Sequence, residues 1–467
     1  MAMGKRSQRQ ESLFLMAERL PKSDGHPFYK QLNRLLAEAG FDRWVERRCR
    51  RYYEQDEKRG RPSIPPGVYF RMLLVGYFEG IDSQRGIAWR CADSLSLRQF
   101  LGIPLDENTP DHSTLTNTRS RLPEEVFHGV FQFVLAIAAK KKLLSGKTVG
   151  VDSTTLEANA AMKSIVRRDT GEDWNEYVTG LMREEGVVEQ DEQPTDEEIR
   201  RFDKSRKNKR VSNKEWVNPN DPDARITKMK DGRTHLAYKA EHVVDLDSDL
   251  VLAAEIRHAD EGDTDTLIDS VMQADLHLKQ AGSQQRIEEV VADKGYHAAH
   301  TIELADDLNL RTYIPEPAYK HDRRWRDKPE EFKRAVYNNR RRVKRAKSRL
   351  LQRRRSELCE RSFAHVCNTG GMRRSWLRGL ADVAKRYLIA GAAHNLGRIL
   401  RRLFGVGKPR ALQGNGEDGD LALLLYFTIA WLRTTVTPLS TPLEVLRATK
   451  KIQSSPAAPS AQPTIAA

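Results

Sequence analysis

The chain of 467 residues lacks the features that mark secreted and membrane-spanning proteins. Its four cysteines show no C-x-x-C spacing, which argues against a disulfide framework. The first ten residues are polar and lack the apolar segment of a signal peptide. The most apolar run, Leu421–Leu432, is shorter than the roughly 20 residues that span a bilayer. We therefore expect this run to be a core helix, and the protein to work in the reducing cytoplasm with no membrane partner. The cysteines are Cys49, Cys91, Cys359 and Cys367.

Two common signatures of cofactor chemistry are also missing. No glycine-rich loop ending in GKS or GKT is present, which argues against chemistry driven by nucleotide hydrolysis. The histidines show no paired spacing typical of a zinc site.

Positive charge is what the chain has in excess. Lys and Arg number 79 against 65 Asp and Glu, which gives a net charge of +14 and a pI near 9.5. A polyanion is the natural partner for such a surface. The charge is densest in 340–355, where ten of sixteen residues are basic. We interpret this stretch as a helix that contacts DNA phosphates; the alternative is a solvated helix with internal ion pairs. The DNA-contact candidates are Arg340, Arg341, Arg342, Lys344, Arg345, Arg353, Arg354 and Arg361.

A second basic motif, Arg59-Gly60-Arg61-Pro62, has the form of a minor-groove clip. It can equally be a linker before Pro65-Pro66.

The hydrophobic pattern predicts a helical part followed by an α/β part. A helix is expected over 27–51, and further helices fill 65–141. One of these helices is expected to start at Asp111–Thr114, where Ser113 or Thr114 can cap and Asp111 favours the positive end of the helix dipole. Strands begin at Lys147, and a hairpin, helices and two more strands follow, which predicts one mixed sheet. We expect a charged insertion over 157–225 that lacks a core apart from Trp174, Tyr177, Leu181 and Trp216. The predicted division is a helical extension (1–60), a helical DNA-end-binding domain (61–142), an α/β catalytic domain (143–405), a C-terminal helix (406–436) and a disordered tail (437–467).

Three acidic residues are spaced as if to hold a pair of metal ions. Asp152 and Asp293 each end a predicted apolar strand, and Glu360 lies on a stretch with helical character. Carboxylate oxygens are hard ligands that suit Mg²⁺ or Mn²⁺. Two such ions, about 3.5–4 Å apart, can activate an attacking oxygen and stabilise a leaving oxygen. The plainer alternative for each aspartate is a turn former or a helix cap. Glu357, one helical turn before Glu360, remains an alternative third ligand.

A further acidic cluster, Asp245, Asp247 and Asp249, resembles the start of a calcium loop. Leu250 stands where that loop needs glycine, and Ile256 where it needs glutamate, so a hairpin turn is expected.

Several short motifs occur in an order that resembles bacterial insertion-sequence transposases of the DDE type. They are Thr109–Thr114, Val151–Thr154, Ala292–Tyr296, Glu360–Phe363, and Arg386–Ala390 with His394-Asn395-Leu396. The resemblance covers roughly residues 60–405. One signature of related transposases, Tyr-x2-Arg-x3-Glu-x6-Lys, is not matched: counted from Glu360, its other positions hold Arg353, Ser356 and Cys367.

The resemblance implies a ribonuclease-H-like mixed sheet flanked by helices, with a helical N-terminal domain and a large insertion after the first strand. It implies that Asp152, Asp293 and Glu360 are the catalytic triad and hold two Mg²⁺ or Mn²⁺ ions. The implied activity is binding of terminal inverted repeats, cleavage of the DNA strand and its transfer to target DNA. The implied partner is double-stranded DNA, bound by a dimer or larger assembly in the bacterial nucleoid. Two other functions remain open: a nuclease of the same fold without strand transfer, and a non-catalytic DNA-binding regulator.

Overall fold

The computed structural model describes residues 24–53, 63–207, 211–229, 232–318, 325–326 and 328–412. The predicted minor-groove clip at Arg59–Pro62, the core helix at 421–432 and the tail at 437–467 lie outside these ranges, as does most of the predicted helix at 406–436. The chain divides into two units, Met1–Pro409 and Arg410–Ala467. The description below concerns the first unit.

The N-terminal part is helical, as predicted. The single helix expected over 27–51 is wrong, because it is two helices, α1 (Pro27–Glu38) and α2 (Phe41–Cys49). Between them Gly40 has a left-handed backbone, with φ of 71°. A left-handed residue cannot continue a helix, so the chain turns there.

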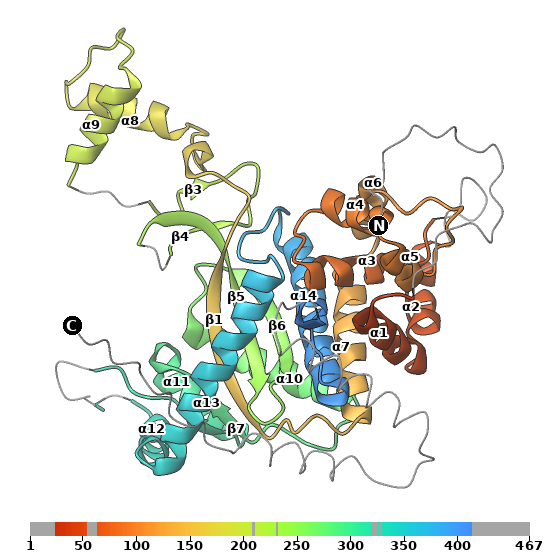
Figure 1. Cartoon of the computed structure of the whole chain (residues 1–467). Helices are drawn as coiled ribbons and strands as arrows, with labels where there is room; N and C mark the ends of the chain where they lie inside the picture. The colour runs from red at the N-terminus through yellow and green to blue at the C-terminus, as the bar shows by residue number, and fades with distance from the viewer. Residues whose placement is uncertain are drawn as a thin grey trace, which may run out of the picture. The chain divides into compact units, whose positions relative to one another are not determined.

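Five further helices complete this part (Figure 1). The helix start predicted at Asp111–Thr114 is present, but Asp111 rather than Ser113 or Thr114 is the cap: its carboxylate accepts the Thr114 N–H at 2.8 Å. This bond and those from the Ser113 and Thr114 hydroxyls lower the pKa of Asp111 to about 2. The helices are α3 (Pro66–Glu79), α4 (Gln84–Asp93), α5 (Leu95–Leu101), α6 (His112–Arg121) and α7 (Glu124–Lys140).

A six-stranded mixed sheet follows, and β5 (Thr234–Asp245) lies near its middle. On one edge β5 pairs antiparallel with β1 (Thr148–Glu157), and on the other with β4 (Arg225–Lys228) and β6 (Val251–His258). Beyond β1 the pairing is parallel, first to β7 (Glu289–Val291) and then to β8 (Arg311–Tyr313). This mixture of antiparallel and parallel strands is consistent with the predicted ribonuclease-H-like core.

The strand expected to end at Asp152 continues to Glu157, so that prediction is wrong. Residues 152–157 pair with residues 237–242 of β5, because β5 is long enough to continue its backbone pairing with β1 to this point. Asp152 therefore lies within a strand rather than at its end. Asp293 lies two residues after β7, close to its predicted place.

Helices lie against both faces of this sheet. Successive side chains of a strand point to opposite faces, so Asp152 and Ser153 mark the two sides. α13 (Ala346–Phe363) lies on the Asp152 side and contacts β1 and β5, as Figure 1 shows. α10 (Asp263–Gln280) lies on the Ser153 side. α14 (Leu380–Phe404) packs between β6 and α7, which joins the sheet to the N-terminal helices.

The segment between β1 and β5 holds two helices, α8 (Trp174–Glu184) and α9 (Asp196–Ser205), and a small sheet of β2 (Val166–Arg167) and β3 (Trp216–Val217). It was predicted to lack a core apart from a few apolar residues. Instead Val178, Met182 and Ile199 are buried together, and the predicted Trp174 and Tyr177 pack against them. Their burial follows from the amphipathic pattern of the two capped helices.

The basic stretch 340–355 is not one helix as predicted. It belongs to α12 (Glu330–Val343) and α13, which are separated at Lys344-Arg345. Arg345 has an extended backbone, with φ of −77° and ψ of 153°, which ends the helical path. The turn predicted at Asp245–Asp249 joins β5 to β6, and the Asp245 carboxylate accepts N–H bonds from Ser145, Gly146 and Asp247.

Candidate functional site

A close approach between α13 and β1 defines the candidate site. A Cβ at Gly150 would lie 2.9 Å from Cγ of Arg355 and 3.3 Å from Sγ of Cys359. Only glycine leaves room for the helix at this distance. Two residues further along β1, on the same face, the Asp152 carboxylate lies under α13 with 23% of its side chain exposed.

Asp293 follows the neighbouring strand. Gly150 of β1 is in parallel register with Val291 of β7, and Asp152 and Asp293 each follow two residues later. Asp152 still lies within β1, whereas Asp293 lies just beyond the end of β7. Asp293 also caps the short turn η5 (Lys294–Tyr296), because its Oδ1 accepts the Gly295 N–H at 2.8 Å.

α13 is anchored beside Asp152 through His242, the residue opposite Asp152 on β5. The Phe363 ring stacks on the imidazole with centroids 4.1 Å apart, and Ser362 Oγ lies 2.8 Å from Nδ1. Ser362 donates its own proton to the Cys359 carbonyl, so Nδ1–H is the donor and Nε2 accepts from the Tyr387 hydroxyl at 2.8 Å. Full burial lowers the pKa of His242 to about 3 and keeps the ring neutral.

The two glutamates of α13 lie one turn apart, about 60° from each other around the helix axis, and have different partners. Glu357 is exposed and pairs with Arg361, which also contacts Asp249 of the hairpin turn. Glu360 is exposed as well, and its Oε1 accepts the Ser356 hydroxyl at 2.9 Å.

The side of α13 that faces β7 is marked by Gln352, whose amide donates to the carbonyls of Ala292 at 3.0 Å and Tyr313 at 2.6 Å. At 100° per residue, Glu360 lies about 80° from Gln352 around the helix axis and Glu357 about 140°. Glu360 is therefore the nearer of the two to the side of Asp293.

The chemistry of these carboxylates fits a divalent metal, although the side chains are not gathered into a cage. Within the described ranges, no group of three or more His, Cys, Asp or Glu side chains is close enough to hold an ion. A cation already neutralises one of them, because Arg355 Nη1 lies 3.1 Å from Asp152 Oδ2. The structure thus places Asp152 within β1 and Asp293 just after the adjacent parallel strand β7, and it leaves Glu360 exposed on α13.

Comparison with known families gives two matches. A transposase domain (DUF772) matches residues 16–121, and a transposase DDE domain matches residues 191–396. Together the two matches take in more than half of the chain. The chain belongs to the DDE transposases of insertion elements. No curated protein and no solved structure matches it.

The family carries out DNA transposition by phosphoryl transfer on bound DNA, and generally uses divalent metal ions. The matched DDE segment includes Asp293 and Glu360 and begins after Asp152. No single helix among the described residues of this transposase is long and apolar enough to cross a membrane. One pair, α6 and α7, passes by length and composition, but its helices meet at 97°.

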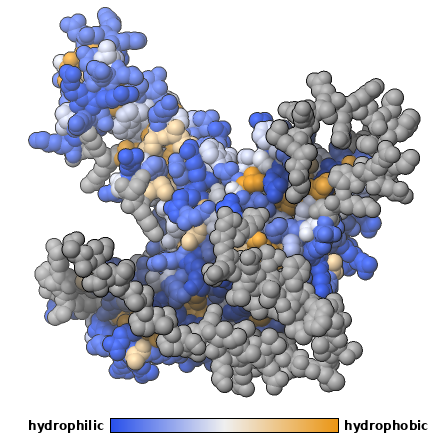
Figure 2. All heavy atoms as spheres, viewed as in Figure 1, coloured by the Kyte–Doolittle hydropathy of each residue, from blue (hydrophilic) through white to orange (hydrophobic). Residues whose placement is uncertain are grey.

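The predicted DNA-contact residues of the transposase fall into two groups. Four of them are held by the protein itself: Arg340 forms two 3.0 Å bonds with Glu316, Arg342 donates to Thr312, and Arg354 and Arg361 pair with Asp247 and Asp249. The other four are exposed and have no ion pair with any described residue: Arg341, Lys344, Arg345 and Arg353. Hydrophilic residues dominate the visible surface in Figure 2.

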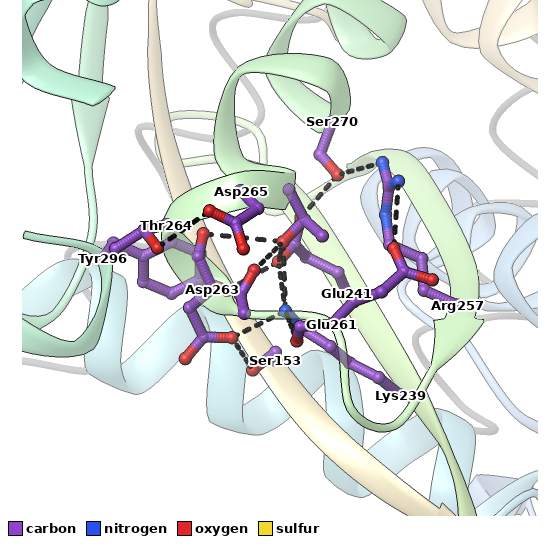
Figure 3. A network of polar contacts seen from close by, with 12 residues as sticks. Ser153, Lys239, Glu241, Arg257, Glu261, Asp263, Thr264, Asp265, Ser270 and Tyr296 are labelled. Carbon is purple, nitrogen blue, oxygen red and sulfur yellow. Dashed lines mark hydrogen bonds and ion pairs between the residues drawn. The ribbon is translucent and has the colours of Figure 1, made fainter. Parts of the chain in front are cut away.

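On the opposite face of the sheet lies a buried polar cluster that the sequence did not predict (Figure 3). We call it the rear network: Ser153, Lys239, Glu241, Asp263, Thr266, Ser270 and Tyr296. A signal for it exists in the sequence, since Lys239 and Glu241 alternate with apolar residues in a strand that is buried on both faces.

Proposed function

We propose that this transposase binds the terminal inverted repeats of its own insertion sequence, cleaves a DNA strand at each end and transfers it to target DNA. The observation that carries the proposal is that β1, which holds Asp152, is adjacent and parallel to β7, which Asp293 follows by two residues, and that α13, the helix of Glu360, contacts both strands. Carboxylates that meet at such a site repel one another unless a cation is shared between them.

Asp152, Asp293 and Glu360 would together hold two Mg²⁺ or Mn²⁺ ions. When bound, the ions neutralise charge at the scissile phosphate and activate the attacking oxygen. Asp152 must first part from Arg355, and the Glu360 side chain must turn towards the strands. Catalysis by the protein is then largely a matter of placing these carboxylates.

The reaction proposed has two displacements at one site. Water attacks a phosphodiester at the element end and releases a free 3′-hydroxyl. That hydroxyl attacks a phosphodiester of the target strand, forms a new bond to its phosphorus and displaces the target 3′-oxygen. Pairing of two element ends requires a dimer or larger assembly, working on DNA in the cytoplasm.

The proposed division of labour follows the sequence boundaries. Residues 61–142 bind the element ends, and residues 143–405 form the catalytic domain, with a charged insertion at about 157–225. On the α12–α13 surface we propose direct phosphate contact for Arg341, Lys344, Arg345 and Arg353. These four are exposed, whereas Arg340, Arg342, Arg354 and Arg361 already have protein partners.

The test uses DNA that flanks the gene on either side, and it measures binding, strand nicking and joined products. Asp152→Asn and Asp293→Asn should each abolish nicking and joining while end binding persists, because asparagine keeps the shape and removes the charge. The control is Asp169→Asn, an exposed carboxylate paired with Arg167. Nicking by either variant at the wild-type rate would contradict the site. Nicking without joined products would indicate the nuclease, and binding alone the regulator.

A further inference from the structure

The rear network lies directly behind the two aspartates. Ser153, the residue after Asp152, donates its hydroxyl to Asp263 Oδ1 at 3.0 Å. Tyr296, three residues after Asp293, donates its hydroxyl to Glu241 Oε2 at 2.9 Å. The network therefore begins one residue after one proposed metal ligand and ends three residues after the other; Ser153 and Tyr296 are labelled in Figure 3.

Lys239 joins these two ends. Its Nζ lies 2.8 Å from Asp263 Oδ1 and 3.6 Å from Glu241 Oε2, and it donates to Thr266 Oγ1 at 3.0 Å. Thr266 in turn donates to Glu241 at 2.8 Å, and the Ser270 hydroxyl donates to the other Glu241 oxygen at 2.5 Å. The path from β1 to η5 is thus continuous through charged or hydroxyl groups.

Asp263 also approaches the Asp293 turn directly. A Cβ at Gly295 would lie 3.2 Å from Asp263 Oδ2 and 3.0 Å from Asp293 Oδ1. The rear-network carboxylate of Asp263 and the proposed metal ligand Asp293 therefore both lie beside Gly295, where a larger residue would meet both.

Burying the charged groups of this network costs free energy, so a stabilising role alone does not account for it. Glu241 is fully buried, and the Lys239 side chain is 6% exposed. Well-packed apolar side chains of similar volume would be at least as stable as a buried ion pair. What a fully bonded polar network adds is a single defined geometry, because each donor and acceptor has its partner in only one arrangement.

We propose that the rear network is a positioning device that fixes the separation of Asp152 and Asp293, and thereby sets the affinity of the site for its metal ions. Ser153, Lys239, Glu241, Asp263 and Tyr296 are its positioning residues. This inference rests on the proposed function, since it assumes that the two aspartates hold metal.

The network can be cut at both ends with two hydroxyl deletions, Ser153→Ala and Tyr296→Phe. The matched control deletes two buried hydroxyls away from the site. Tyr238→Phe removes a bond to the Asp221 carboxylate, and Ser375→Ala removes one to the Leu377 carbonyl. Mn²⁺ alone is the probe, titrated into the full chain and followed by electron paramagnetic resonance.

We expect the double variant to bind Mn²⁺ about tenfold more weakly than wild type, since groups behind metal ligands typically contribute 10–100-fold. The control pair should bind as wild type, with a similar fall in the thermal unfolding midpoint. Ser153→Ala alone, the milder change, should weaken binding several-fold, and Ser153→Thr, which keeps the hydroxyl, should restore it.

Unchanged Mn²⁺ affinity in both Ser153→Ala and the double variant would overturn the inference, and so would an equal loss in the control pair. Asp152→Asn separates this failure from failure of the proposed function. If Asp152→Asn abolishes Mn²⁺ binding while the rear-network variants bind normally, only the positioning role is wrong. If Asp152→Asn also binds normally, the metal site is wrong and the inference falls with it.

Discussion

Arg355 reaches from α13 to the first aspartate of the proposed site, with its Nη1 3.1 Å from Asp152 Oδ2. The guanidinium is largely buried, with 12% of the side chain exposed, and its stem lies over Gly150. The same helix carries Glu360, five residues later. One element therefore supplies both a positive charge next to Asp152 and the proposed third ligand.

Arg355 should compete with a metal ion for Asp152. Replacement by methionine keeps much of the stem and removes the charge, so Arg355→Met should tighten Mn²⁺ binding to the DNA-free protein. An ion pair worth about 1 kcal/mol corresponds to about fivefold in affinity. Calorimetric titration with Mn²⁺ measures the change, and Arg353→Met, an exposed site without an ion partner among the described residues, is the control. Weaker binding in Arg355→Met would mean that the arginine helps to build the site.

The exposed and paired arginines of α12 and α13 should behave differently on DNA. Changing Arg341, Lys344 and Arg345 to glutamine should weaken duplex binding with little sequence dependence. It should reduce the slope of log K against log salt by roughly 0.9 for each DNA phosphate that the variant no longer neutralises. Binding measured across a salt series tests this expectation.

The matched control changes Arg340, Arg342 and Arg354 to glutamine. These residues bond to Glu316, Thr312 and Asp247, so the unfolding midpoint should fall while the salt slope stays near wild type. Equal slopes for the two triple variants and wild type would contradict phosphate contact by the exposed group.

Some of this arrangement follows from the sequence, and some depends on contacts it does not reveal. The apolar runs before Asp152 and Asp293 correctly predicted neighbouring strands, because β-branched runs favour buried strands whatever their partners. The length of β1 was missed because residues 152–157 are held by the long partner β5. The break at Lys344-Arg345 was missed because no glycine or proline marks it.

The candidate site also combines features that the sequence predicts with features that only tertiary contacts reveal. The acids could be selected by type and spacing, whereas the pairing of Arg355 with Asp152 depends on how closely α13 crosses Gly150. The rear network depends on α10 packing against β5, a contact between segments more than 20 residues apart. Such contacts are set by tertiary packing and leave only a weak local pattern.

His242 should make folding stability fall in mild acid. Burial lowers its pKa to about 3, against about 6.5 in an unfolded chain, so the unfolded state takes up a proton first. The folding stability that depends on this neutral ring is fully present above pH 6.5 and is lost as the pH falls towards 3. Between pH 7 and pH 5 wild type should lose about 2 kcal/mol more unfolding free energy than His242→Gln. Urea unfolding at the two pH values measures this, and equal losses would contradict a buried neutral ring. Other buried histidines titrate in both proteins and cancel in the comparison.

The third metal ligand can be decided between two glutamates on one helix. Glu360 lies about 80° from Gln352, the residue of α13 that bonds to Ala292 beside Asp293, whereas Glu357 lies about 140° away. Glu357 is also held by Arg361, which is itself bonded to Asp249. Glu360→Gln should therefore eliminate Mg²⁺-dependent nicking and joining, and Glu357→Gln should retain substantial activity. Both glutamates are exposed, and each substitution keeps the side-chain shape while removing its charge. Each variant is therefore the other's control for folding. The reverse result would move the ligand to Glu357, and equal losses would mean that one residue binds the metal while the other orients it.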